Sequence, residues 1–268
     1  MKTLIIAAPF DPVSEKEISA VKKMQRDGGY RNVVLHVCRE GVLSRELRLK
    51  LLKTAVSRYR RWSVSPAENE DAVTLENEVI ESEAEVRGGA FLKAAKGIRR
   101  LLAENTWYYE TALDACCKPK RAVHSRSVAD VCLMLASAHG LDREQAWKAG
   151  ILHDVTKAWS DEKGKAFLQV YAPEIVPLAP AIYHSYTCPV FLKTVMGIQD
   201  RLILSAIREH TLGTCSSDLS KILYIADKIE PTRGYDASEE TALALRDLDA
   251  AFRLVFQEAA EYRERNRE

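Results

Sequence analysis

Apolar residues near the N-terminus form two short runs separated by a helical pattern. Residues 4–8 and residues 32–38 are almost continuously apolar, a length and composition typical of buried strands. Between these runs, Ile18, Val21 and Met24 recur at helical spacing. A strand–helix–strand unit of this length predicts a right-handed crossover within a parallel sheet.

The pattern changes from mixed to purely helical near residues 114–119. Before this point, residues 47–55 and 98–109 predict helices, residues 62–64 predict a short strand, and the acidic stretch 66–85 predicts loops with one short strand. After it, every apolar stripe has helical spacing. These stripes are Val128, Val131, Cys132 and Leu135; Trp147, Ile151 and Val155; Ile203, Ala206 and Ile207; Leu219, Ile222, Ala226 and Ile229; and a last helix over residues 245–262. We therefore expect an α/β, Rossmann-like domain at residues 1–114 and an all-α helical bundle at residues 118–268.

Composition places the chain among globular proteins and excludes some partners. Of its 268 residues, 47% are hydrophobic and 29% are charged, which suits a packed core. The net charge of +1 gives no basic surface for nucleic acid, and no apolar run approaches the roughly 20 residues of a membrane span. Asp11 and Pro12 interrupt the first apolar run, so we interpret it as a strand and not as a signal peptide. The six cysteines show no C-x-x-C spacing, so we expect reduced thiols and a cytoplasmic protein, with homodimerisation left open.

Imidazole and carboxylate side chains collect in the helical half. The candidates are His124, His153, Asp154, His184, His210 and Asp227. Such side chains are the ligands of iron, manganese and zinc, and helical bundles build metal sites from facing helices. A single histidine on an apolar face is more often a core residue, and His36 and His139 are given that structural role. The joint pattern, with the adjacent pair His153–Asp154 expected about 100° apart on one helix, favours a site in which Asp154 reaches between two metals.

The motifs around these residues resemble a known family. They are His124-Ser125, ILHDVTK at 151–157, His184 with a Pro–Val pair soon after it, AIREHTLG at 206–213 and ADKIEPTR at 226–233. On these motifs, residues 120–262 resemble the HD hydrolase superfamily, and within it the YqeK-type symmetrical diadenosine tetraphosphate hydrolases. The chain departs from that pattern where Ser-Tyr-Thr follows His184, because the family usually has a small Gly-Pro turn there.

The resemblance implies an all-α fold with two divalent metal ions. Iron is the family's metal, and manganese or another divalent ion is the alternative. By position, His124, His153, Asp154 and Asp227 hold one metal, His184 and His210 hold the second, and Asp154 bridges them. Coordination lowers the pKa of water from about 16 towards about 7, which makes a nucleophile available at neutral pH. Attack at an inner phosphorus of diadenosine tetraphosphate then expels ADP.

The chemistry also predicts residues that meet the substrate. Asp154 and Lys157 are the catalytic candidates, and Lys157, Arg208, Thr211 and Arg233 are the candidates for binding phosphate, because they adjoin the metal ligands in sequence. For each basic residue a surface salt bridge is the alternative, and for Thr211 a helix cap. Two other functions stay open. One is an HD phosphohydrolase of another nucleotide, such as a nucleoside monophosphate or a cyclic dinucleotide, and the other is a non-catalytic nucleotide-sensing protein.

The first domain carries a second, broken resemblance. The run LIIAAPFDPV is similar to the first strand and loop of nicotinate-mononucleotide adenylyltransferases. That family continues with H-x-G-H, whereas this chain has Ser14, Lys16 and Glu17 at those positions, and only residues 82–87 match a later phosphate-binding motif. The resemblance implies a retained fold without adenylyl transfer, which serves as a scaffold, a dimer surface or a degenerate nucleotide-binding module. An unrelated α/β domain with a chance Phe-Asp-Pro-Val is the alternative.

Overall fold

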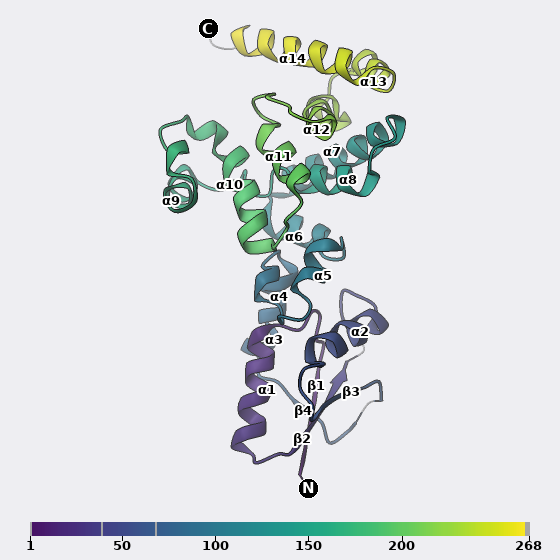
Figure 1. Ribbon diagram of the computed structural model, residues 1–268, viewed down its shortest axis with the longest axis vertical. Coiled ribbons are helices and arrows are strands. Elements are labelled where there is room, and N and C mark those ends of the chain that lie inside the picture. The colour runs from purple at the N-terminus through teal and green to yellow at the C-terminus, as the bar shows by residue number, and fades with distance from the viewer. Residues whose placement is uncertain (1, 39, 68, 266–268) are drawn as a thin grey trace. The chain divides into compact units, whose positions relative to one another are not determined.

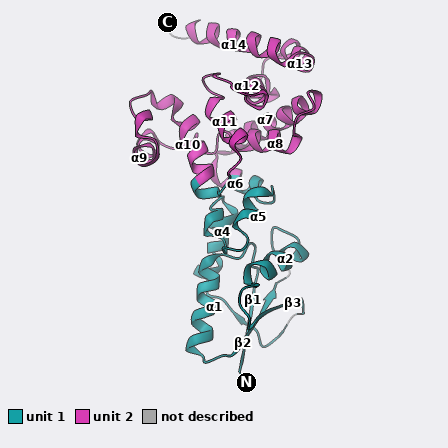
Figure 2. Cartoon of the chain, viewed as in Figure 1, with its two compact units in different colours: residues 1–112, 194–198 teal, residues 113–193, 199–268 magenta. Residues whose placement is uncertain are grey.

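The computed structural model describes residues 2–38, 40–67 and 69–265 (Figure 1). The chain forms two compact units (Figure 2). Unit 1 comprises residues 1–112 and 194–198, and unit 2 comprises residues 113–193 and 199–268. A short segment from the second half of the sequence therefore belongs to the unit built by the first half.

Unit 1 is built on a parallel sheet. Its strands are β1 (Thr3–Ala8), β2 (Asn32–Val37), β3 (Trp62–Ser65) and β4 (Val73–Thr74), in the order β3-β2-β1-β4. Helix α1 (Glu15–Asp27) joins β1 to β2, and helix α2 (Arg45–Val56) joins β2 to β3. Alternate side chains of β1 are buried, among them Ile6, as expected for a strand with one face on the core, whereas Leu35, His36 and Val37 of β2 are buried in succession. The predicted strands and both helices are confirmed.

Buried hydrogen bonds fix the loop after β1. Asp11 is buried, and its carboxylate accepts hydrogen bonds from the Tyr108 hydroxyl and the Val42 backbone N–H. The buried Arg48 guanidinium donates to the carbonyl oxygens of Pro9 (2.8 Å) and Leu43 (3.0 Å). The Phe-Asp-Pro-Val motif thus fastens β1 to the rest of unit 1.

Two predictions for the end of unit 1 were wrong. The stretch 66–85 contains the expected short strand β4, but it also contains α3 (Asn77–Ile80) and the start of α4 (Ser82–Arg87), because Val79 and Val86 are buried against the core. Residues 98–109 form no single helix: α5 (Arg99–Glu104) stops at Asn105, whose backbone is extended and whose side chain donates to the Leu101 carbonyl oxygen (2.8 Å). The 3-10 helix η1 (Phe91–Lys93) also lies here, and α6 (Tyr109–Cys116) begins in unit 1 and ends in unit 2.

Unit 2 is helical, as predicted. Its α-helices include α7 (Pro119–Ala138), α8 (Arg143–Leu152), α9 (Asp161–Tyr171), α10 (Tyr183–Phe191), α11 (Arg201–Glu209), α12 (Asp218–Ile229), α13 (Ser238–Ala244) and α14 (Leu248–Arg265). Unit 2 also contains the short 3-10 helices η2 (Pro173–Ile175), η3 (Pro180–Ile182) and η5 (Pro231–Arg233). The π-helix η4 (Leu192–Met196) begins in unit 2 and ends within the segment assigned to unit 1. The four predicted stripes are buried in α7, α8, α11 and α12, apart from Trp147, which is half-buried, and Val155, which lies beyond α8.

Close packing of α7 on α8 depends on one glycine. A Cβ atom placed on Gly150 would lie 2.5 Å from the Ala129 Cα atom, so only glycine allows the two backbones to approach this closely. Helix α8 then ends at Leu152, and His153, Asp154 and Val155 lie in the following turn, which corrects the expectation of one continuous helix through this pair.

The last helix of the chain also has a boundary that differs from the prediction. The expected helix over residues 245–262 begins only at Leu248, because the Asp247 carboxylate accepts from the Ala250 backbone N–H (2.9 Å) and starts α14 there. Helix α13, which the apolar pattern did not predict, precedes it. Across the described ranges, none of the helices combines the length and apolar character that crossing a membrane requires.

Candidate metal centre

The six predicted ligand residues lie together in the core of unit 2. They come from five places in the sequence: His124 from α7, His153 and Asp154 from the turn after α8, His184 from α10, His210 from the end of α11 and Asp227 from α12. All six are buried. Helix α11 begins at the Asp200 side-chain cap and α12 at the Ser217 cap, so the starts of both helices are fixed.

Three of the histidines have one ring nitrogen occupied by the protein. The Nδ1 atom of His153 donates to the Gly150 carbonyl oxygen (2.7 Å), and that of His210 donates to the Ile207 carbonyl oxygen (2.6 Å). The Nδ1 atom of His124 lies 2.9 Å from Oε1 of the buried Glu230. Because each Nδ1 carries the hydrogen, each Nε2 presents a lone pair to the centre, as outer hydrogen bonds arrange in metal sites.

The centre leaves buried lone pairs unsatisfied. Within the described part of the chain, Nε2 of His124, Nε2 of His153 and Oδ1 of Asp154 are buried without a hydrogen-bond partner. The Nε2 atom of His124 lies 3.1 Å from Oδ1 of Asp227, so two acceptors face each other. Burying such groups without compensation is costly, and a cation between them removes the cost.

Ligand atoms form two triads that share one carboxylate. One triad is His124, His153 and Asp154, the other is Asp154, His184 and His210, and the atoms of each lie within 4.8 Å of one another. Oδ1 of Asp154 lies 3.6 Å from Nε2 of His184 and 3.7 Å from Nε2 of His210, while Oδ2 lies 3.5 Å from Nε2 of His153. This arrangement can hold two cations with Asp154 between them.

Both aspartates are held in the charged form. Burial acts to raise the pKa of Asp154, but the rings of His153 and His210, when protonated, outweigh it and hold this pKa well below its ordinary value. Burial likewise acts to raise the pKa of Asp227, but the neighbouring Lys228 ammonium outweighs it and holds this pKa well below its ordinary value. Two carboxylates that stay ionised in a buried site are suited to binding a divalent cation.

Positive side chains surround the two carboxylates. Arg121 donates to Oδ2 of Asp154 (3.0 Å), and Lys228 donates to Oδ2 of Asp227 (2.7 Å). Arg233, predicted to bind substrate, donates instead to the backbone oxygen (2.6 Å) and Oδ1 (2.8 Å) of Asp227. Its guanidinium therefore fixes a candidate ligand, and a contact with substrate stays a prediction.

His184 has neighbours suited to a substrate. Nζ of Lys157 lies 3.1 and 3.2 Å from its ring nitrogens, and Oγ1 of Thr211 lies 3.0 Å from Nε2. Burial lowers the pKa of His184 to about 3, with Asp154 opposing, so the ring is neutral and can act as a ligand. Burial also lowers the pKa of Lys157. The fourth substrate candidate, Arg208, is exposed and lies over the Tyr186 ring (5.5 Å).

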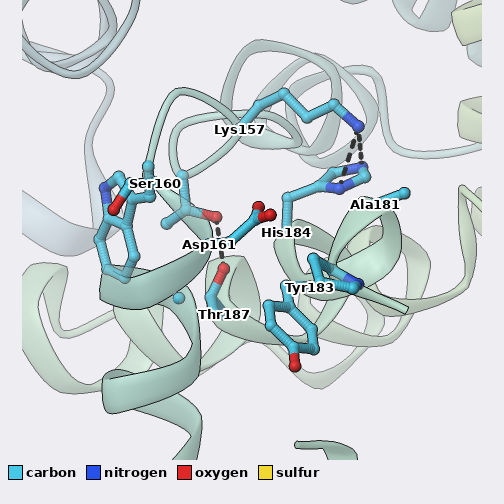
Figure 3. Close-up of a pocket in the computed structure, with 11 residues that line it drawn as sticks. Lys157, Ser160, Asp161, Ala181, Tyr183, His184 and Thr187 are labelled. Carbon is cyan, nitrogen blue, oxygen red and sulfur yellow. Dashed lines mark hydrogen bonds between the residues drawn. The ribbon is translucent and has the colours of Figure 1, made fainter. Parts of the chain in front are cut away.

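A cavity of about 310 Å³ opens beside His184 (Figure 3). Lys157 and His184 lie on one side of it, and Thr187 and Tyr183 of α10 line it as well. Of the six candidate ligands, His184 lines this cavity, so a molecule bound there would meet the cluster at His184.

Sequence reasoning missed the residues that support the ligands. Arg121 and Glu230 bond Asp154 and His124, and the Cys188 thiol donates to the Leu152 carbonyl oxygen (3.1 Å) in front of the His153–Asp154 turn. Glu230 and Lys228 lie within the ADKIEPTR motif and Arg121 lies three residues before His124, so proximity to the ligands was the available signal. His139, given a structural role, accordingly lies 2.6 Å from the Ala244 carbonyl oxygen, whereas the buried His36 has no partner within the described ranges.

Comparison with known proteins places these residues in context. The HD domain family matches residues 121–232. The symmetrical bis(5'-nucleosyl)-tetraphosphatase of Bacillus subtilis (strain 168) is 34% identical over 148 residues, which cover 51% of this chain and 78% of that protein. A probable nicotinate-nucleotide adenylyltransferase/Ap4A hydrolase of Mycoplasma genitalium is 29% identical over 164 residues, which cover 57% of this chain and 46% of that protein.

A solved structure gives the same picture for the fold. A crystal structure of a predicted HD superfamily hydrolase involved in NAD metabolism from Clostridium acetobutylicum matches with a TM-score of 0.54 and 31% identity. The match covers 57% of this chain and 84% of that one.

Proposed function

The chain belongs to the symmetrical bis(5'-nucleosyl)-tetraphosphatase family of HD-domain phosphohydrolases, and on this premise we propose that it hydrolyses diadenosine tetraphosphate to two ADP with two divalent metal ions. Family membership confirms the resemblance found in the motifs. The observation that carries the proposal is the pair of buried triads that share Asp154.

The residues present fit two cations. The buried unpartnered atoms of His124, His153 and Asp154 need a positive partner, and two ionised carboxylates lie among four histidines. His124, His153, Asp154 and Asp227 would hold the first ion, and Asp154, His184 and His210 the second. When bound, such ions supply an activated water and neutralise phosphoryl charge. A mixed imidazole–carboxylate set accepts iron, as the family resemblance implies, and also manganese.

The chain's own residues bind and orient the phosphates. Lys157 lies beside the second triad with its amine towards His184, where a phosphate oxygen of the substrate would meet positive charge. The Thr211 hydroxyl receives a hydrogen bond from Ser185 (2.6 Å) and lies 3.2 Å from Nε2 of His210, so it is positioned to donate to a phosphate oxygen. The leaving group is itself a phosphate anion, so electrostatic stabilisation matters more than proton donation.

For residues 1–114 we propose a Rossmann-like relic of a nucleotidyltransferase domain. The parallel sheet and the Phe-Asp-Pro-Val loop support this origin. Glu17, at the position of a family histidine, is buried, and the capping bond between its carboxylate and the Ser14 backbone N–H (2.7 Å) starts α1. Burial and then the neighbouring Glu83 carboxyl raise the pKa of Glu17. Because this chain has no histidine at these positions to stabilise the transferring phosphate, we infer that unit 1 does not catalyse adenylyl transfer.

The test uses the full-length protein loaded anaerobically with iron, and in parallel with manganese. Metal content is measured first, and two ions per chain are expected. Diadenosine tetraphosphate is then added and the products are resolved by ion-exchange chromatography. ADP as the sole product supports symmetrical cleavage. ATP with AMP as products would refute symmetrical cleavage. No turnover with two ions bound would indicate that the substrate is another phosphoester.

A further inference from the structure

A buried hydrogen bond joins two hydroxyl groups beside the second triad. Ser185 of α10 is fully buried, and its hydroxyl donates to Oγ1 of Thr211 (2.6 Å), which lies 26 residues further along the chain. A serine inside a helix commonly donates to a carbonyl oxygen of the preceding turn of the same helix. Ser185 donates instead to the segment that carries His210, so the bond links the residues that follow His184 and His210.

The backbone that carries Ser185 is fixed by its neighbours on α10. Oγ1 of Thr187 lies 2.8 Å from Oγ1 of Thr156, and the Cys188 thiol donates to the Leu152 carbonyl oxygen (3.1 Å). Thr187, Cys188, Thr156 and Leu152 are all buried. These contacts hold α10 against the end of α8 and the turn after it, so the position of the Ser185 hydroxyl is set by the fold.

The backbone of Thr211 is also fixed. Thr211 lies in the turn after α11, where the Gly213 N–H donates to the Glu209 carbonyl oxygen (2.9 Å) and the φ of Gly213 is 71°. A Cβ atom on Gly213 would lie 2.7 Å from the Phe256 ring, so this turn is packed against α14. The freedom that remains is rotation of the Thr211 side chain and its hydroxyl hydrogen. The bond from Ser185 occupies one lone pair of Oγ1 and leaves the Thr211 hydrogen to be donated elsewhere.

In this structure the nearby acceptors for that hydrogen are imidazole nitrogens. Oγ1 of Thr211 lies 3.0 Å from Nε2 of His184 and 3.2 Å from Nε2 of His210. The Nδ1 atom of His210 donates to the Ile207 carbonyl oxygen, so its Nε2 atom is an acceptor. Under the proposed function both Nε2 atoms are metal ligands, and a lone pair that binds a cation no longer accepts a hydrogen bond. The Thr211 hydrogen then has no acceptor on either ring.

We propose that Ser185 is a positioning residue for phosphate binding, which keeps Thr211 as a donor to a phosphate oxygen once the second triad holds its ion. The proposal rests on the proposed function and deepens it, because it assigns to Ser185 a part that neither the motifs nor the ligand set assigns. Ser185 is buried and acts through Thr211 without touching the substrate. The hydroxyl of Thr211 becomes free for phosphate only when metal has bound, so metal and phosphate should strengthen each other's binding.

The first test measures phosphate binding and needs no turnover. Inorganic phosphate is titrated into the manganese-loaded full chain by calorimetry. Thr211→Val should weaken phosphate binding by about tenfold or more, and Ser185→Ala by about three- to tenfold. Manganese affinities, measured by competition with a chelator, should stay within about threefold in both variants. Phosphate affinity of Ser185→Ala within about twofold of the unchanged protein would overturn the proposal.

A matched control removes a buried hydroxyl elsewhere in unit 2. Ser220 is fully buried, its hydroxyl lies 3.0 Å from that of Ser217, and it lies at the opposite end of α12 from Asp227. Ser220→Ala should bind phosphate as the unchanged protein does. Circular dichroism and thermal unfolding of all variants check that the helices are intact.

A double variant separates positioning from packing. Because Ser185 acts through Thr211, Ser185→Ala should change phosphate affinity by less than about twofold when Thr211→Val is already present. A further loss of about threefold or more in that background would show that Ser185 acts through the packing of α10, and would overturn the positioning role.

Hydrolysis then distinguishes this proposal from the proposed function. If the unchanged protein does not cleave diadenosine tetraphosphate, the proposed function fails, while the phosphate titration still decides the role of Ser185. If cleavage occurs, Ser185→Ala should lower kcat/KM by about three- to tenfold with ADP still the sole product. Thr211→Ser, which retains the hydroxyl, should stay within about threefold of the unchanged protein. Full activity of Ser185→Ala would overturn the positioning role and leave the proposed function intact.

Discussion

Glu230 holds His124 in position, so Glu230→Gln should weaken the binding of one metal ion and leave the binding of the other unchanged. The carboxylate lies 2.9 Å from Nδ1 of His124 and is itself held by the backbone N–H and hydroxyl of Thr232, both at 2.7 Å. Glutamine keeps the shape but removes the charge that orients the imidazole and makes it a stronger ligand. The first triad contains His124 and the second does not.

The size of the effect follows from the role of outer hydrogen bonds. Loss of such a partner typically lowers metal affinity by about 10–100-fold, which is about 1.4–2.7 kcal/mol. The assay is a competition titration of metal-free protein with manganese against a chelator, which resolves the two binding steps. We expect the affinity of one step to fall by this amount and that of the other to stay within about threefold.

Two controls separate orientation from folding. Glu239→Gln changes an exposed glutamate of α13 in the same way and should leave both affinities unchanged. Thermal unfolding of the metal-free variants shows whether the helices are intact. If Glu230→Gln binds both ions as the unchanged protein does, then Glu230 does not tune His124 and our reasoning is refuted.

The other predictions concern the bridge, unit 1 and the α7–α8 contact. Asp154→Ala should abolish hydrolysis and keep the helical circular dichroism signal, and ordinary activity in the metal-loaded variant would contradict a shared carboxylate. Glu17→Gln should stabilise unit 1 at pH 8 by about 1.5 kcal/mol, because burial and Glu83 raise the pKa of Glu17 and the charged form is unfavourable in the folded chain above that pKa. Below pH 4.5 the carboxyl is protonated in both the folded and the unfolded chain, so the gain in stability measured by thermal unfolding should vanish. A gain that grows towards low pH would refute this account. Gly150→Ala should cost about 1–3 kcal/mol in denaturant unfolding, because its Cβ would meet the Ala129 backbone, and a cost below about 0.5 kcal/mol would show that α8 shifts freely.

The sequence was most informative where chemistry is carried by residue type and least where it depends on tertiary packing. His153 and Asp154 could be recognised from their motif, and their burial followed from the apolar stripes beside them. The bond from Glu230 to His124 joins positions 106 residues apart, so no local pattern reports it. The end of α8 at Leu152 was missed because the apolar spacing continues through Val155. The helices α3 and α4 were missed because their glutamate-rich sequence has weak periodicity, and burial of Val79 and Val86 decides their conformation.

The segment 194–198 delays the completion of unit 1 while the chain is synthesised. Met196 and Ile198 are buried, and the segment belongs to unit 1, where Met196 lies against Gly89 and Gly197 lies against Leu92 and Ala103. Domains generally fold as the ribosome releases them, N-terminal first. This last strip of unit 1 leaves the ribosome only after α7, α8, α9 and α10 have been made. We therefore expect the nascent N-terminal unit to lack these buried residues while those four helices emerge.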